Sequence, residues 1–241
     1  MAAERSTWYA LVLRLVRNGF FRICTGGLQS YGEENIPKTG PVIFAPNHLS
    51  NLDPPAVACG TNKRQLAFMA KEELFKGIFG KLIASVGAFK VRRGESDTES
   101  IRMALALLEQ GRALLVFPEG TRGNGKQMGP FNRGVAMLAK RSGAAVVPIG
   151  VVGTHIVAPK GGKGLKRHLI TVAYGKPFTY EEIAVKEAPE RDNRERFAKE
   201  LENRIIALCA AHGLELKSAE SGSPQPLRPD PARSVAPRTG C

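Results

Sequence analysis

Residues 41–54 read Pro-Val-Ile-Phe-Ala-Pro-Asn-His-Leu-Ser-Asn-Leu-Asp-Pro, a short apolar run followed at once by a polar turn and a proline. A short apolar run with turn residues beside it is typical of a buried strand, here Val42–Ala45. Pro54 and Pro55 fit the first turn of a helix, because proline lacks only an N–H that would be unpaired there. The stretch therefore predicts a strand, a turn and a helix, which is the repeating unit of an α/β fold.

The turn in this stretch places a histidine and a carboxylate five residues apart, at His48 and Asp53. On one unbroken helix, residues five apart point about 140° away from each other, so the two side chains meet only if the chain turns back. We expect Asp53 to be the N-cap of the helix and to reach the imidazole from there. The pair would then be a general base and its orienting acid. The alternative is that Asp53 only caps its helix and His48 only satisfies the turn.

The alternation of apolar runs with helical patterns continues to about residue 211 and predicts a mixed, largely parallel sheet flanked by helices. Further strands are expected over 65–69, 88–91, 113–117, 145–151 and 169–174. Further helices are expected over 54–59, 72–85, 98–110, 132–141 and 190–211.

The N-terminal segment, from Trp8 to Ile23, predicts an amphipathic helix or helix pair with Arg14 and Arg17 opposite its apolar face. Such a helix can lie in a membrane interface, with Trp8, Tyr9, Phe20 and Phe21 near the acyl boundary, or it can pack on its own domain. We therefore expect three parts: a membrane-associating segment over 1–35, a catalytic-type domain over 36–215, and a disordered tail rich in Pro, Ser and Arg over 216–241.

The composition indicates an acidic partner, because the formal net charge is +13 and the isoelectric point is near 9.9. Aromatic residues make up only 7% of the chain and no base-stacking or zinc-finger pattern is present, so nucleic acid is the weaker option. The four cysteines have no CxxC spacing, and no metal site is expected. No apolar run reaches 18 residues, so no membrane-spanning helix is expected.

A second polar motif, Phe-Pro-Glu-Gly-Thr-Arg at 117–122, follows the predicted strand 113–117. The end of a strand is where α/β proteins usually place ligand contacts. Arg122 could bind a phosphate through two parallel hydrogen bonds, and Gly120 would let backbone amides approach the anion. The alternative is an exposed Glu119–Arg122 ion pair that only stabilises a turn.

Three further cations follow other predicted strands. Lys71 follows the strand at 65–69, and Arg92 and Arg93 follow the strand that ends at Val91. Because the carboxyl ends of parallel strands share one edge of a sheet, these cations would gather beside His48. Taken singly, each is an ordinary solvated loop charge. Their convergence with a base favours a site for a phosphorylated substrate.

In this order the motifs resemble those of the 1-acyl-sn-glycerol-3-phosphate acyltransferases, within the glycerophospholipid acyltransferase superfamily. The resemblance covers about residues 40–175 and rests on four blocks. These are an NHxSxxD block at Asn47, His48, Ser50 and Asp53, a block ending in arginine at 87–93, the unchanged FPEGTR block at 117–122, and a proline block at 147–149. Arg92 stands where the family often has aspartate, which changes the local charge.

The resemblance implies transfer of a fatty acyl group from acyl-CoA or acyl carrier protein to the sn-2 hydroxyl of lysophosphatidic acid, giving phosphatidic acid. It implies no cofactor, no metal and no covalent acyl-enzyme, with His48 as the general base and Asp53 orienting it. Substrate-binding residues would be Lys71, Arg93, Glu119, Gly120, Thr121 and Arg122. The protein would sit at an anionic membrane surface on the cytoplasmic face and would bind no nucleic acid.

Two alternatives remain open at this stage. The first is a related acyltransferase that acts on another lyso-lipid or on glycerol 3-phosphate. The second is a basic, non-catalytic module that binds lipid or nucleic acid, in which His48 and Asp53 are structural.

Overall fold

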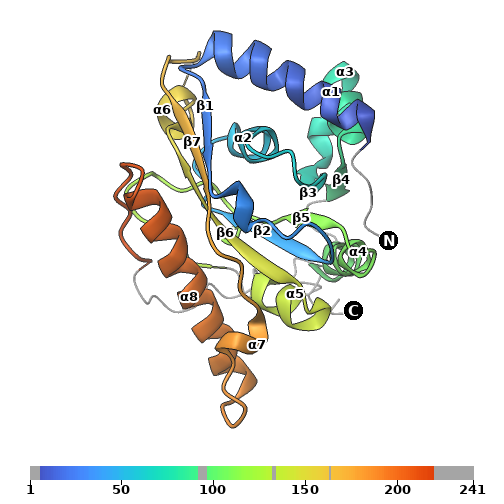
Figure 1. Ribbon diagram of the computed structural model, residues 1–241, viewed down its shortest axis with the longest axis vertical. Helices are drawn as coiled ribbons and strands as arrows, with labels where there is room; N and C mark the ends of the chain where they lie inside the picture. Colours follow the sequence, from blue (N-terminus) through green and yellow to red (C-terminus); the bar gives the residue numbers. More distant parts are fainter. Residues whose placement is uncertain (1–5, 92–96, 132–133, 163, 220–241) are drawn as a thin grey trace, which may run out of the picture.

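The computed structural model describes residues 6–91, 97–131, 134–162 and 164–219. Its strands form one seven-stranded sheet with helices on both faces (Figure 1). The strands are β1 (Leu28–Tyr31), β2 (Val42–Pro46), β3 (Leu66–Lys71), β4 (Ala88–Val91), β5 (Ala113–Leu115), β6 (Ala145–Val152) and β7 (Ile170–Tyr174). The α-helices are α1 (Thr7–Leu15), α2 (Asp53–Cys59), α3 (Gly77–Ser85), α4 (Asp97–Glu109), α5 (Gly134–Ser142), α6 (Thr154–Val157), α7 (Tyr180–Ile183) and α8 (Glu190–Ala210). The other helical segments are the π-helix η1 (Val16–Cys24) and the 3-10 helices η2 (Glu33–Asn35) and η3 (Glu72–Phe75).

The sheet is mixed and mostly parallel, as the sequence predicted. Its strand order is β1-β7-β6-β2-β5-β3-β4. The strands from β6 to β4 are parallel to one another, whereas β7 runs antiparallel to β6 and carries β1 parallel to itself. The predicted fold class is therefore confirmed, and β2 lies between β6 and β5 near the middle of the sheet.

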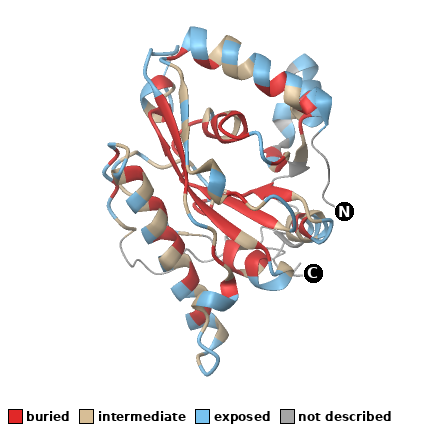
Figure 2. Cartoon of the chain, viewed as in Figure 1, coloured by how far each residue is buried: buried red, intermediate tan, exposed pale blue. Residues whose placement is uncertain are grey.

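The two faces of the sheet are covered by different helices, because successive side chains of a strand point to opposite faces. Ile43 of β2 packs in a core with α4, α5 and α8, and its neighbour Phe44 packs in a second core with α1, η1 and α2. Figure 2 shows the central strands buried between these layers, whereas β1 at the edge of the sheet has no buried residue. Strand β2 is buried at every position, which fits a central strand of a parallel sheet.

The N-terminal helix packs on the domain by one face and leaves another face exposed. Ser6 caps α1 by accepting a hydrogen bond from the Tyr9 N–H, and Tyr9, Val12 and Phe21 are buried in the second core. The expectation that Tyr9 and Phe21 lie at an acyl boundary is therefore wrong, because both rings fill the space above the sheet. No helix in the described part of the chain has the length and apolar character needed to cross a bilayer.

The remaining differences from the sequence prediction are local. Strand β1 and the short helices α6 and α7 were not predicted, and the helix expected over 72–85 is divided into η3 and α3. In the tail predicted over 216–241, Leu216 is buried and the Ala219 N–H donates to Glu202, so this part of the tail packs on the domain. The rest of that tail lies outside the described residues.

Candidate functional site

The carboxyl ends of β2, β5 and β3 meet at one edge of the sheet, as the sequence predicted for its polar motifs. Phe44 of β2 is paired in register with Leu115 of β5, and Leu115 with Phe68 of β3. The turn that carries His48 and the loop that starts at Phe117 therefore leave the sheet side by side. Lys71, the last residue of β3, marks the same edge, whereas Arg93 lies outside the described residues.

Asp53 holds the His48 turn through a single carboxylate oxygen. Its Oδ2 atom is 2.9 Å from His48 Nδ1 and accepts hydrogen bonds of 2.7 Å from the backbone N–H groups of Leu49 and Ser50. The prediction that the pair meets is confirmed, but the predicted N-cap is wrong. Leu52 occupies the N-cap position, and Asp53 is the first residue of α2, with its side chain turned back to the preceding turn. Asp53 therefore does not merely cap its own helix.

The contacts of Asp53 fix which nitrogen of His48 is free. The Asp53 Oδ2 atom already accepts hydrogen bonds from two backbone N–H groups, so it faces His48 Nδ1 as an acceptor. The proton of the neutral imidazole therefore lies on Nδ1, and Nε2 keeps a lone pair. The Phe117 ring stacks on the imidazole with the ring centres 4.0 Å apart, and 18% of the His48 side chain is exposed. This arrangement provides a base that an external hydroxyl can reach.

Glu119 is a buried support for the same turn. Its Oε1 atom accepts a 2.8 Å hydrogen bond from the His48 N–H, and its Oε2 atom accepts one of 2.8 Å from the Gly129 N–H. Burial raises the pKa of the Glu119 carboxyl, and the two backbone donors oppose that rise. Within the described residues Glu119 and Arg122 form no ion pair, so the alternative of an exposed turn-stabilising pair is wrong. Whether Glu119 also contacts substrate stays a prediction.

The end of the Phe117–Arg122 loop is more open. Gly120 adopts a φ of +63°, which glycine adopts without steric cost, and Thr121 is exposed. Arg122 is half-buried, and no described carboxylate lies within ion-pair distance of its guanidinium. The loop is joined to the His48 turn by a 2.7 Å hydrogen bond from the Gly123 N–H to the His48 carbonyl. The backbone at Arg122 therefore lies next to the His48 turn, and the guanidinium forms no ion pair with a described carboxylate.

Two side chains of the first motif hold the turn in ways that the sequence reading did not foresee. Asn47 is fully buried and bridges β2 to β6, accepting from the Val151 N–H and donating to the Val151 carbonyl at 2.7 and 2.9 Å. Ser50 is also buried, and its hydroxyl donates to the Ala158 carbonyl at 2.8 Å. Both residues stand in the motif, but their partners are more than 100 residues away in the chain.

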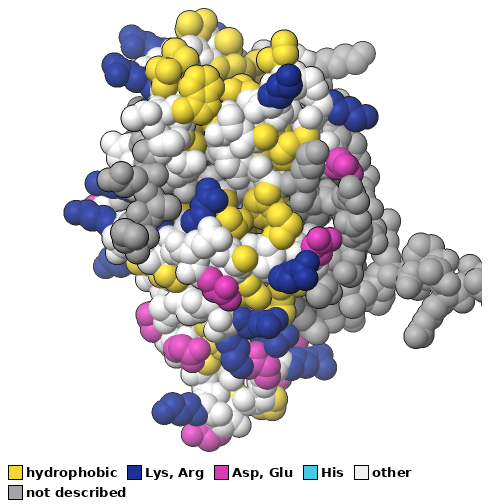
Figure 3. Space-filling view, turned by 90° about the vertical axis from the view of Figure 1, so that its right-hand side faces the viewer, with side chains coloured by type: hydrophobic (Ala, Val, Ile, Leu, Met, Phe, Trp, Pro, Cys, Tyr) yellow, Lys and Arg dark blue, Asp and Glu magenta, His cyan; other side chains and the backbone are white. Residues whose placement is uncertain are grey.

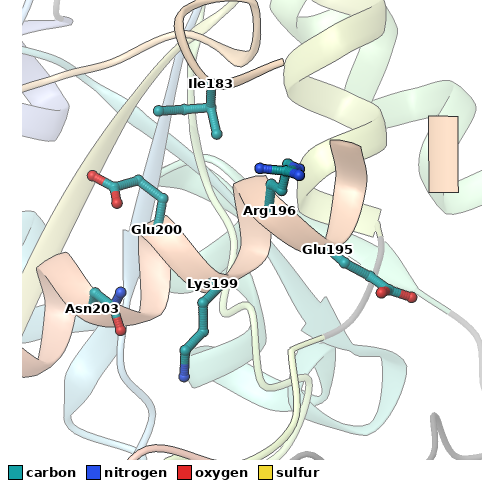
Figure 4. A pocket seen from close by; sticks show the side chains of 6 residues that line it. All are labelled: Ile183, Glu195, Arg196, Lys199, Glu200 and Asn203. Atoms are coloured by element: carbon teal, nitrogen blue, oxygen red, sulfur yellow. The ribbon is translucent and has the colours of Figure 1, made fainter. Parts of the chain in front are cut away.

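Other surface features lie away from this site. A shallow depression of about 440 Å³ is lined by Ile183 and by charged side chains of α8, among them Glu195 and Lys199 (Figure 4). It includes none of the predicted site residues. Within the described ranges, no group of three or more His, Cys, Asp or Glu side chains is arranged to hold a metal ion.

Comparison with known proteins shows the family to which the chain belongs. The sequence model of the Acyltransferase family matches residues 27–152, from β1 to the end of β6. The chain is 30% identical to a 1-acyl-sn-glycerol-3-phosphate acyltransferase of Bacillus subtilis over 76% of this chain and 92% of that protein. It is also 30% identical to the chloroplastic 1-acyl-sn-glycerol-3-phosphate acyltransferase LPAT1 of Arabidopsis thaliana, over 62% of this chain and 41% of that longer protein.

The fold is shared with a solved structure. The crystal structure of the 1-acyl-sn-glycerophosphate acyltransferase PlsC from Thermotoga maritima superposes with a TM-score of 0.68 at 23% identity, covering 88% of this chain and 84% of that one. The family match includes the His48 turn, Asp53 and the whole Phe117–Arg122 loop. The chain therefore belongs to the acyltransferase family that includes the 1-acyl-sn-glycerol-3-phosphate acyltransferases, as its sequence motifs predicted.

Proposed function

We propose that the protein transfers a fatty acyl group from acyl-CoA or acyl carrier protein to the sn-2 hydroxyl of lysophosphatidic acid. The observation that carries this proposal is the His48–Asp53 pair, whose Nε2 atom is left free beside a loop with an unpaired arginine. The names of the relatives from Bacillus subtilis and Arabidopsis thaliana support the same acceptor.

In the proposed reaction His48 acts as the general base. Its Nε2 atom takes the proton of the lyso-lipid hydroxyl as the oxygen attacks the thioester carbonyl carbon. The new C–O ester bond forms, the C–S bond breaks, and the departing thiolate receives the proton from the imidazolium. Asp53 keeps the ring in one orientation and stabilises the imidazolium while it exists.

The surroundings of Ser50 support direct transfer rather than an acyl-enzyme. The Ser50 hydroxyl is the buried group most readily suspected as a nucleophile in this turn, but it donates to the Ala158 carbonyl and accepts from the Leu52 N–H. A nucleophilic serine instead needs an exposed oxygen and an adjacent base. Ser50 therefore fits a role in shaping the turn.

The phosphate of the acceptor would bind at the Arg122 side of the site. The Lys160 Nζ atom donates to the Arg122 carbonyl at 3.0 Å, so a second cation lies close to the arginine. A phosphate held there would bring the hydroxyl to His48, and such positioning contributes strongly to catalysis. Lys71, Arg93, Gly120 and Thr121 stay predicted contributors to the same subsite.

In this proposal the protein binds the membrane through the outer face of α1 and α3. The two helices are joined by a 3.0 Å hydrogen bond from Trp8 Nε1 to Ser85 Oγ. Figure 3 shows hydrophobic side chains gathered at this end of the molecule with Lys and Arg around them. We call this the α1–α3 patch, and its exposed apolar residues are Trp8, Leu11, Leu15, Ile78 and Leu82. An exposed apolar patch with basic residues beside it fits an anionic bilayer surface.

The test is an acyl-transfer assay with His48→Ala and the matched control His212→Ala, whose ring stacks on Tyr31 away from the site. We expect wild type and the control to form phosphatidic acid, and His48→Ala to lose at least about 10³-fold in kcat with its circular dichroism unchanged. Near-normal turnover by His48→Ala would refute the mechanism.

The same assay separates the acceptors and donors. Lysophosphatidic acid, a second lyso-lipid and glycerol 3-phosphate are each offered with acyl-CoA and with acyl carrier protein. Preference for glycerol 3-phosphate or for the second lyso-lipid would change the proposed acceptor and leave His48 as the proposed general base.

A further inference from the structure

One basic loop lies next to the site, and apart from Lys160 its residues have no part in the proposed chemistry. It runs from α6 to the start of β7, and we call residues 156–169 the 156–169 loop; Lys163 within it lies outside the described residues. Its sequence combines several glycines with Lys160, Lys166 and Arg167. Since β6 ends just before α6, the loop leaves the sheet at the edge that carries His48.

Hydrogen bonds join the 156–169 loop to both halves of the site. The Ala158 carbonyl accepts from the Ser50 hydroxyl of the His48 turn at 2.8 Å. The Lys160 Nζ atom donates to the Arg122 carbonyl at 3.0 Å, and the Lys166 N–H closes the loop on the Val157 carbonyl at 2.9 Å. The loop is therefore part of the rim of the site.

The outer surface of the loop is both apolar and cationic. Ile156, Leu165 and Leu169 are 39%, 48% and 38% exposed, so three large aliphatic side chains of this segment face solvent. Lys160, Lys166 and Arg167 are also exposed. Among the described residues none of these three cations takes part in an ion pair.

The sequence around the loop leaves its charge uncompensated. No Asp or Glu occurs between Glu119 and Glu181, whereas Lys and Arg together occur ten times in that stretch. Among the described residues one cation of this stretch, Lys140, pairs with Glu190, and the other ion pairs of Lys and Arg lie within α4 or α8. A surface of this kind is complementary to an anionic partner that also accepts aliphatic side chains.

The 156–169 loop lies next to the end of η1 in space. The Gly26 N–H donates to the His168 carbonyl at 2.9 Å, and Ile23 at the end of η1 is 69% exposed. Gly153, just before α6, lies against the Leu169 backbone with a φ of +89°, and a Cβ atom there would lie only 2.2 Å from the Leu169 carbonyl oxygen. The last turn of η1, α6 and the start of β7 are therefore packed together, as Figure 1 also shows.

We propose that the 156–169 loop is a second membrane contact, which binds the anionic surface of a bilayer and brings the rim of the site to the lipid headgroups. This inference rests on the proposed function, because a loop bound to the bilayer would let the site take its lyso-lipid acceptor directly from the membrane. Leu165, Leu169 and Ile156 insert at the headgroup boundary, and the three cations meet lipid phosphates. The exposed aliphatic residues favour a bilayer over the phosphates of a soluble acyl donor.

The experiment measures binding of the full-length protein to sedimented vesicles of phosphatidylglycerol mixed with phosphatidylcholine. The test variant is Leu165→Ser/Lys166→Gln/Arg167→Gln. The matched control is Val185→Ser/Lys186→Gln, on the connection between α7 and α8, where Val185 is 42% exposed. We expect the test variant to bind on the order of tenfold more weakly, with a shallower dependence on salt, and the control to bind like wild type.

A second arm measures turnover of a short-chain lysophosphatidic acid that is dispersed as monomers. There we expect unchanged kcat and unchanged KM for both substrates. Wild-type vesicle binding by the test variant would overturn the proposal, and so would a raised KM for the thioester with unchanged vesicle binding, which would assign the loop to the acyl donor. Because vesicle binding needs no turnover, an inactive wild-type protein would refute the proposed function and leave this test intact.

Discussion

The His48 turn is fixed by hydrogen bonds from buried side chains, whereas the α1–α3 patch is largely exposed. In the turn, the Asp53 Oδ2 atom and both Glu119 carboxylate oxygens bind backbone N–H groups, and Asn47 bridges to β6. In the patch, Ile78 is 89% exposed, and the Trp8–Ser85 hydrogen bond joins the two helices.

Under the proposed function, the contrast follows from what each region would bind. A general base works only when its nitrogen lies within hydrogen-bond distance of one hydroxyl, so its supports must be short, buried and directional. A bilayer surface has no fixed atoms to match, so apolar area and positive charge are sufficient. Substitutions in the turn should therefore act on the rate, and substitutions in the patch should act on partitioning.

The largest effect is expected for Asp53→Asn. Asparagine can keep one oxygen on the three donors that the Oδ2 atom serves, but it replaces the carboxylate that stabilises the His48 imidazolium in the proposed reaction by a neutral amide. We expect kcat to fall about 10³-fold. Steady-state kinetics with Asp192→Asn on the exposed side of α8 as the control checks this. A loss confined to KM would show that Asp53 serves binding instead.

A smaller effect is expected for Glu119→Gln. Glutamine keeps one oxygen, so either the His48 N–H or the Gly129 N–H loses its acceptor, at a cost of about 1–3 kcal/mol in stability. We expect a lower melting temperature and a fall in kcat on the order of tenfold to a hundredfold, compared with the exposed control Glu181→Gln. If stability is unchanged and only the KM for lysophosphatidic acid rises, Glu119 is a substrate ligand, as the sequence reading predicted.

The patch should respond without loss of stability. For Ile78→Asp, we expect vesicle binding to fall roughly tenfold, because an aliphatic side chain is replaced by a charge that anionic lipid repels. Unfolding free energy should change by less than about 0.5 kcal/mol, as for most exposed positions. Val185→Asp is the matched control, and a fall in turnover of a monomeric lyso-lipid by Ile78→Asp would break the separation of the two regions.

The smallest effect is expected from thiol alkylation. Burial raises the pKa of both Cys59 and Cys209 to about 12, so at pH 8 only about one thiol in 10⁴ is ionised at each site. Cys24 is exposed at the end of η1. We expect iodoacetamide at pH 8 to modify Cys24 but to spare Cys59 and Cys209 until the protein is unfolded, with no change in activity. Peptide mass mapping reads out the result, and labelling of Cys209 in the folded protein would show that the core opens.

The sequence was sufficient to predict β2 and the His48–Asp53 pair, because an apolar run and two prolines determine the local backbone there. Strand β1 was missed because two of its four residues are half-buried and two are exposed, and because its partner, β7, is far along the chain. The supporting role of Glu119 was missed for the same kind of reason. Nothing in residues 117–122 shows that the carboxylate turns inward to a backbone N–H 71 residues earlier.

The packing of the N-terminal segment has a practical consequence for truncation. Tyr9, Val12 and Phe21 fill the core above the sheet, and β1, which follows them, covers the edge of β7. Trimming the chain to remove a membrane anchor would uncover both the core and a sheet edge, and such edges promote aggregation. Detergent or a point substitution should therefore be used to release the folded protein from lipid. Aggregation of a truncated protein would be no evidence for or against membrane binding.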